Sequence, residues 1–139
     1  MFADTLPIIT VGAVNYFGFT SRFSQGGDLL TVSAAGENIR CASVVTDTTV
    51  EMTGTSFAAP AVAGLAAYLL SVEKYQTELT GNGEASQLPY NMKRLIQSLA
   101  YIRTDGTEPS IFNGVDWLDP NPCWYNSMLP KRQACCKFY

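Results

Sequence analysis

The sequence of 139 residues contains no histidine at all. Histidine is the side chain that most often acts as a general base near neutral pH, and it is also the commonest metal ligand. Four cysteines are present, but no two of them have the C-x-x-C spacing typical of zinc sites. We therefore expect no bound metal and no cofactor, and any nucleophile in this chain lacks the usual base.

Charged residues are also scarce, at 15% of the chain against 47% hydrophobic residues, and the formal net charge is −3. This composition argues against intrinsic disorder and favours a largely buried chain of single-domain size. No extended basic patch is present, so we expect no nucleic-acid partner.

No apolar run is long enough to span a membrane. The longest, Phe57 to Leu70, is too short for a membrane span and has Pro60 near its start. It predicts a buried helix in a soluble domain, so we expect no membrane partner. The N-terminal segment has an apolar middle but no positive leader, and Asp4 and Pro7 interrupt it. It therefore does not predict a signal peptide.

Short runs rich in β-branched residues, separated by glycines and polar residues, predict four strands. These runs are Ile8–Val14, Leu30–Ala35, Ile39–Val45 and Thr48–Met52. The first is apolar on both faces, as in a buried parallel sheet. The last two are expected to form a hairpin about Thr46-Asp47.

Two helices are expected. The first, Ser56–Val72, is apolar all round, which is typical of a buried helix. The second, Ser86–Tyr101, carries apolar residues at three- and four-residue spacing, namely Met92, Leu95, Ile96, Leu99 and Ile102. Lys93 and Arg94 on this helix are expected to face water, and the polar segment Thr77–Gln87 to form a loop.

The sequence after the second helix predicts an irregular tail, because prolines recur at 109, 120, 122 and 130. We divide the chain into 1–104 and a tail, 105–139, that contains proline, tryptophan and cysteine. Trp117 and Trp124 are expected to pack the tail against the surface of the domain. A disulfide from Cys123 to either Cys135 or Cys136 is favoured, because a bond between adjacent cysteines is strained. Cys41 is expected to be a buried free thiol.

Ser56 is the candidate nucleophile. A hydroxyl in the first turn of a helix lies where backbone N–H groups point outward and where the helix dipole favours negative charge. The N–H of Ser56 itself could donate to an oxyanion. Gly54 would let the chain turn and a substrate approach, and Pro60 would help to fix the start of the helix. The simpler interpretation is a helix cap, since serine and threonine are favoured there whatever the chemistry.

The longer pattern Gly54-Thr55-Ser56-x-Ala58-x-Pro60-x-Val62-Ala63-Gly64 resembles the nucleophile motif of the subtilisin-like serine proteases, the subtilases. Upstream blocks similar to further elements of that family stand in the same order and spacing. These blocks are Ile9–Val14, Phe23-Ser24 and Val32–Ile39. The resemblance covers about residues 2–103.

This resemblance implies an α/β fold, as a partial three-layer sandwich with a mostly parallel sheet that carries the central nucleophile helix. It implies Ser56 as the nucleophile in peptide-bond hydrolysis, with its backbone N–H as an oxyanion donor. Gly54, Thr55 and Pro60 are then supporting motif residues. It also implies a peptide or protein substrate and an extracellular location. The catalytic aspartate, histidine and oxyanion asparagine of the family all precede the strand that matches Ile8–Val14.

No other side chain is expected to replace the histidine. Lys74 lies eighteen residues after Ser56, which is roughly 27 Å along a helix. Lys93 is expected on an exposed face, and Glu51 in solvent. We therefore expect the C-terminal part of a serine endopeptidase that is inactive alone and is complemented by an N-terminal half. Two alternatives stay open: a non-catalytic binding module derived from a subtilase, and one chain of a split protease.

Overall fold

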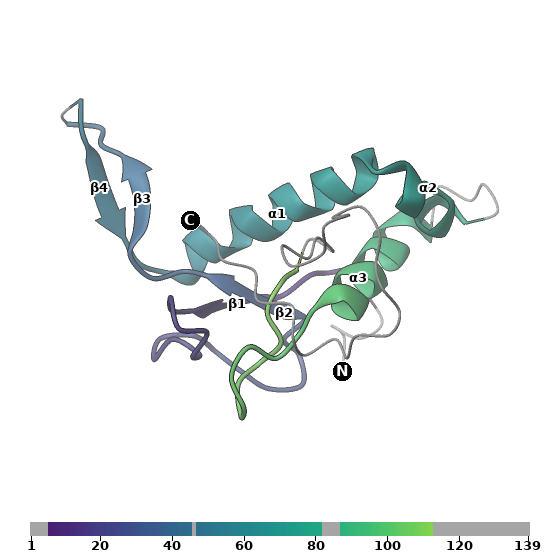
Figure 1. The fold of residues 1–139 in the computed structure, drawn as a ribbon, viewed down its shortest axis with the longest axis horizontal. Coiled ribbons are helices and arrows are strands. Elements are labelled where there is room, and N and C mark those ends of the chain that lie inside the picture. The colour runs from purple at the N-terminus through teal and green to yellow at the C-terminus, as the bar shows by residue number, and fades with distance from the viewer. Residues whose placement is uncertain (1–5, 46, 82–86, 113–139) are drawn as a thin grey trace, which may run out of the picture.

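The computed structural model describes residues 6–45, 47–81 and 87–112 (Figure 1). Within these ranges the chain forms β1 (Val11–Val14), β2 (Val32–Ala35), β3 (Ile39–Ala42), β4 (Thr49–Met52), α1 (Thr55–Ser71), α2 (Glu73–Thr80) and α3 (Leu88–Leu99). The order of elements agrees with the sequence except for α2. The predicted disulfide and the two tryptophans lie outside the described residues.

Strands β1 and β2 pair in parallel, with Val11 opposite Val32 and Val14 opposite Ala35. The far edge of β2 is extended by a later segment, because the amide of Ser33 donates to the Pro109 carbonyl at 2.7 Å and Ile111 donates back to Ser33 at 2.9 Å. The sheet thus joins residues 76 to 78 positions apart in the sequence. Helix α1 packs on one face of this sheet.

The outer edge of β1 is partly closed by the loop that follows the strand. The amide of Ser21 donates to the Ala13 carbonyl at 2.9 Å, and the Ala13 amide donates to the Ser24 hydroxyl at 2.9 Å. The strand is shorter than the predicted Ile8–Val14, and Ile8 is 53% exposed. The expectation of burial on both faces is wrong at Ile8, which lies before β1 begins, whereas Gly12, Ala13 and Val14 within the strand are buried as expected.

Strands β3 and β4 form the predicted antiparallel hairpin, which projects from the rest of the molecule (Figure 1). One face carries Ile39, Cys41, Val50 and Met52, and the other places Arg40 opposite Glu51. Cys41 is a free thiol, as expected, but it is half-buried rather than buried. The hairpin therefore presents an apolar face that the described part of the chain covers only in part, with Val50 40% and Met52 44% exposed.

Helix α1 lies across β1 and β2 and buries Ala58, Val62, Leu65 and Leu69. These residues recur every three or four positions, so they form one stripe along the helix. After Val72 the chain bends by 97° into α2, which buries Tyr75 and Leu79. The predicted end of the first helix at Val72 lies within one residue of the end of α1, but the predicted loop Thr77–Gln87 is wrong at its start, since α2 runs to Thr80.

Helix α3 begins with Pro89 in its first turn, as predicted, and buries Met92, Leu95 and Ile96. Arg94 is exposed, as expected. Lys93 is not: it is only 8% exposed, and its ammonium donates to the Leu6 carbonyl at 3.3 Å. The prediction of a solvated Lys93 is wrong because its stem covers apolar surface while its charged end reaches a backbone acceptor.

No single helix in the described ranges is long and apolar enough to cross a membrane. Helices α1 and α2 meet the length and composition criteria only when taken together, across their 97° bend.

Candidate active site

The start of α1 is tied to the ends of both parallel strands. The amide of Gly36, just after β2, donates to the Val14 carbonyl at the end of β1 at 3.0 Å. The amide of Gly54 donates in turn to the Gly36 carbonyl at 2.8 Å. In open α/β sheets, sites form outside the carboxyl ends of the strands. Ser56, two residues after Gly54, is thus held at that edge.

Gly54 makes the turn from the hairpin into α1. Its φ of 159° and ψ of 157° lie at the border of the region that glycine adopts far more easily than other residues. Its carbonyl accepts the Phe57 amide at 3.0 Å, the first bond of the helix. Gly54 therefore sets the direction in which α1 starts, and with it the position of Ser56 in its first turn.

The hydroxyl of Ser56 is not a helix cap. Gly54 is the N-cap residue, and no side chain makes a capping hydrogen bond to this helix. Ser56 is exposed, and its amide belongs to the first turn, where the helix supplies no acceptor. The simpler interpretation of the motif thus fails, and the side chain and amide of Ser56 both remain suited to a substrate.

The other motif residues surround Ser56 in the first turns of the helix. Thr55 is the first helical residue and is half-buried. Pro60 lies inside the helix and is exposed. Since proline has no N–H, it cannot donate to the carbonyl of Ser56, four residues earlier. The chain is thus less tightly hydrogen-bonded around Ser56 than in a regular helix.

The candidate bases lie elsewhere. Lys74 follows the far end of α1, with its ammonium 5.1 Å from the centre of the Tyr75 ring. Lys93 lies on α3, which packs against α2 rather than against the start of α1 (Figure 1). Glu51 is exposed on β4 and faces Arg40 across the hairpin. That Ser56 has no base among the described residues stays a prediction.

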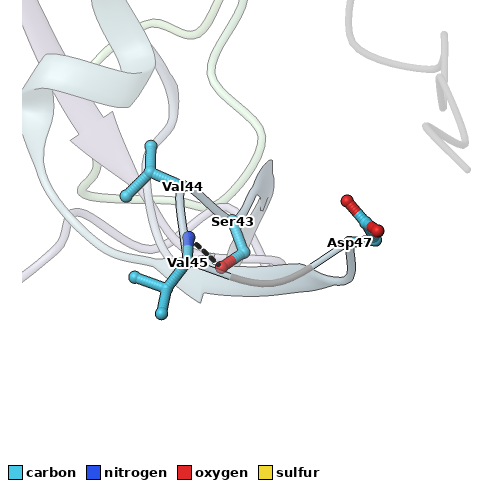
Figure 2. Close-up of a pocket in the computed structure, with 4 residues that line it drawn as sticks. All are labelled: Ser43, Val44, Val45 and Asp47. Carbon is cyan, nitrogen blue, oxygen red and sulfur yellow. Dashed lines mark hydrogen bonds between the residues drawn. The ribbon is translucent and has the colours of Figure 1, made fainter.

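An open hollow occurs at the tip of the hairpin, lined by Ser43, Val44, Val45 and Asp47 (Figure 2). The Ser43 hydroxyl accepts a hydrogen bond from the Val45 amide at 3.2 Å, and Val44 is fully exposed. Strand β4 separates this hollow from Ser56, so it forms no part of the candidate site.

Within the described ranges, no group of three or more histidine, cysteine or acidic side chains could hold a metal ion.

Comparisons with known proteins identify the family and the fold of the chain. Residues 3–115 match the model of the subtilase family. The chain is 44% identical over 114 residues to subtilisin-like protease 2 of Arthroderma otae, covering 81% of this chain and 26% of that protein. It is 32% identical over 112 residues to proteinase R of Parengyodontium album, covering 75% of this chain and 28% of that protein.

Among solved structures, a cold-adapted subtilisin-like serine proteinase superposes with a TM-score of 0.63 at 26% sequence identity. The match covers 82% of this chain and 39% of that one. The chain therefore spans little more than a quarter of its two named curated relatives, and it adopts part of the α/β fold that was expected. With more than three quarters of its length matched, the chain belongs to the subtilase family of serine peptidases.

Proposed function

We propose that Ser56 is the nucleophile of a serine endopeptidase and that this chain supplies the nucleophile without its base. The observation that carries the proposal is the exposed, uncapped Ser56 at the carboxyl edge of the parallel strands. Family membership supports it, since serine peptidases cleave peptide bonds through a serine hydroxyl.

In this proposal the hydroxyl oxygen of Ser56 attacks the scissile carbonyl of a peptide or protein substrate. The Ser56 amide donates to the oxyanion that forms, and the positive end of α1 adds to its stabilisation. The amine leaves, and water then hydrolyses the acyl-enzyme. The step requires a base to take the hydroxyl proton, and this chain has no histidine.

The absence of that base decides what the chain can do alone. In subtilisin itself, loss of the catalytic histidine lowers turnover by about 2 × 10⁶-fold. Loss of one oxyanion donor, by itself, costs a factor on the order of 10²–10³. We therefore propose that residues 1–139 are inactive alone and need a segment that supplies the aspartate, the histidine and the oxyanion asparagine. An extracellular location is proposed on the strength of the family alone.

A second candidate is a non-catalytic binding module. The observation that favours it is the amount of exposed apolar surface on α1 and on the hairpin, which a partner could cover. This candidate predicts stable association without any reactivity at Ser56.

A fluorophosphonate probe, which labels activated serines, separates the two. The chain is treated alone and mixed with the part of the A. otae peptidase domain that precedes the matched stretch. Labelling of the mixture, absent with Ser56→Ala, supports the proposed peptidase. Association without labelling favours the binding module, and labelling of the chain alone contradicts the proposal that its base is missing.

A further inference from the structure

The loop that follows β1 displays three aromatic side chains to solvent. Tyr16 is 80% exposed, Phe17 is 71% exposed and Phe19 is 50% exposed. We call these three residues the aromatic patch. The rings of Tyr16 and Phe17 meet edge to face, with their centroids 5.5 Å apart. Single exposed apolar residues are normal on a protein surface, whereas a group of them indicates an interaction site.

Hydrogen bonds of the loop hold the aromatic patch in place. The Asn15 side-chain oxygen accepts the amides of Phe17 and Phe19, and the Asn15 amide donates to the Phe19 carbonyl at 2.9 Å. The Thr104 hydroxyl donates to the Phe17 carbonyl at 3.2 Å. A surface that is already ordered loses less conformational entropy when it binds. The loop therefore presents the three rings in a form that is ready for a partner.

The charges around the patch are mainly positive. Arg22 is the only charged residue within 5–27. Arg103 is exposed and lies beside the loop, since a Cβ built on Gly18 would be 2.8 Å from the Cβ of Arg103. Even with Asp105 counted, two cations stand against one anion here, whereas the whole chain has a net charge of −3. A partner that complements this surface is apolar and carries negative charge.

This chemistry suits a polypeptide better than a lipid bilayer. Aromatic residues and arginine are the residue types enriched at protein–protein interfaces. Anionic membranes are recognised by clusters of about four to eight basic residues, whereas Arg22 and Arg103 are two. The occupant that fits the aromatic patch is therefore an acidic, apolar polypeptide segment.

The loop begins at the edge of the sheet that holds the candidate nucleophile. Asn15 follows Val14, whose carbonyl accepts the Gly36 amide, and the Gly36 carbonyl accepts the amide of Gly54. Hydrogen-bonded neighbouring strands lie about 4.7–4.9 Å apart, so these two steps span about 10 Å. The loop and the start of α1 lie at the same end of the molecule (Figure 1). An extended polypeptide advances about 3.3 Å per residue, so one polypeptide can contact both Ser56 and the loop.

We propose that the aromatic patch binds an acidic, apolar segment of the polypeptide whose peptide bond is presented to Ser56. This inference rests on the proposed function, because it names the class of substrate for the same site. The patch holds the substrate several residues away from the scissile bond and takes no part in the chemistry. Its binding requires no base, so it can be measured with the chain alone.

Fluorescence anisotropy of the full chain with a labelled peptide that alternates glutamate with leucine and phenylalanine tests the binding. Two peptides of equal length, with lysine for glutamate or with serine for the apolar residues, are expected to bind more weakly. Phe17→Ser is expected to weaken binding of the acidic peptide about tenfold. Arg103→Gln should weaken it by a smaller factor that vanishes at high salt. Leu70→Ser, at a residue 43% exposed on α1, is the matched control and should bind as wild type does.

Equal binding by Phe17→Ser and wild type would overturn the proposal, as would no binding of the acidic peptide by wild type. An equal loss in Leu70→Ser would also overturn it, because attraction to any exposed apolar residue would then explain the binding. Two further results would assign the patch to another occupant and so refute the proposal. One is binding of phosphatidylserine vesicles but not of the peptide, and the other is self-association that Phe17→Ser abolishes.

The link to Ser56 is tested after addition of the N-terminal part of the A. otae peptidase domain. Phe17→Ser is expected to raise KM for the acidic peptide about tenfold and to leave fluorophosphonate labelling of Ser56 unchanged. Peptide binding that depends on Phe17, with no labelling of Ser56, would leave the patch a binding surface and refute the proposed peptidase. Labelling of Ser56 with a KM that Phe17→Ser leaves unchanged would refute this inference and leave the peptidase standing.

Discussion

The amide of Gly54 donates a hydrogen bond of 2.8 Å to the carbonyl of Gly36. This bond holds the start of α1 next to the end of β2, and it thereby fixes the position of Ser56 relative to the sheet. Gly36 is itself bonded to Val14 at the end of β1. The position of the candidate nucleophile therefore depends on two glycines that are 18 residues apart in the sequence.

The first prediction concerns Gly36→Ala. A Cβ at this position would lie 2.7 Å from the Cβ of Ala13 and 3.0 Å from the Gly54 carbonyl oxygen. The backbone has to shift, so we expect the free energy of unfolding to fall by about 1–3 kcal/mol. Gly64→Ala is the matched control: it has open space and is expected to add roughly 0.5–1 kcal/mol. Urea denaturation measures both, and equal midpoints would contradict the close packing at Gly36.

The second prediction compares two neighbouring leucines on α1. Leu69 is fully buried, whereas Leu70 is 43% exposed. Leu69→Ala is expected to lower the free energy of unfolding by about 2–5 kcal/mol. Leu70→Ala should change it by less than about 1 kcal/mol in the chain alone. Similar losses for both variants in thermal or urea unfolding would show that α1 is buried on both sides without a partner.

The third prediction concerns Lys93, whose ammonium donates to the Leu6 carbonyl from a buried position. Lys93→Ala removes both this bond and the packed stem, so we expect a loss of about 1.5–3 kcal/mol. The amides of Leu6, Ile8 and Ile9 should also exchange faster. Exposed Arg94 provides the control, since Arg94→Ala is expected to stay within about 0.5 kcal/mol of wild type. Unchanged exchange of the Leu6, Ile8 and Ile9 amides in Lys93→Ala would show that the bond from Lys93 to Leu6 does not hold this segment in place.

The fourth prediction concerns the loop after β1. The Asn15 side-chain oxygen accepts the amides of Phe17 at 3.0 Å and Phe19 at 3.1 Å. Asn15→Ala removes this acceptor and is expected to cost about 1–2 kcal/mol. Exchange of both amides should accelerate. Asn15→Asp keeps an oxygen in the same place and should preserve their protection; loss of protection in both variants would show that the acceptor is not what orders this loop.

Local patterns predicted most of the elements. The apolar run and its glycine placed α1 within one residue at each end, and the strand runs placed the hairpin. Helix α2 was missed because its sequence is mostly polar. Its signal was the pair Tyr75 and Leu79, which stand four residues apart and are both buried.

Contacts between distant segments could not be predicted from local patterns. Lys93 is buried because Leu6, 87 residues away in the sequence, offers it an acceptor. The pairing of Ser33 with the segment around Ser110 is of the same kind. At the candidate site, the motif predicted a turn, a serine and a helix start. Only the structure showed that Ser56 is exposed and that its hydroxyl does not cap the helix.

The most direct measurement is the mass of the peptide that contains Ser56 after treatment with a fluorophosphonate probe. The account predicts no adduct on the chain alone. It predicts an adduct on Ser56 once the N-terminal part of a subtilase domain is bound, and none in Ser56→Ala. An adduct on Ser56 in the chain alone would contradict the account, and so would a complex in which Ser56 stays unmodified.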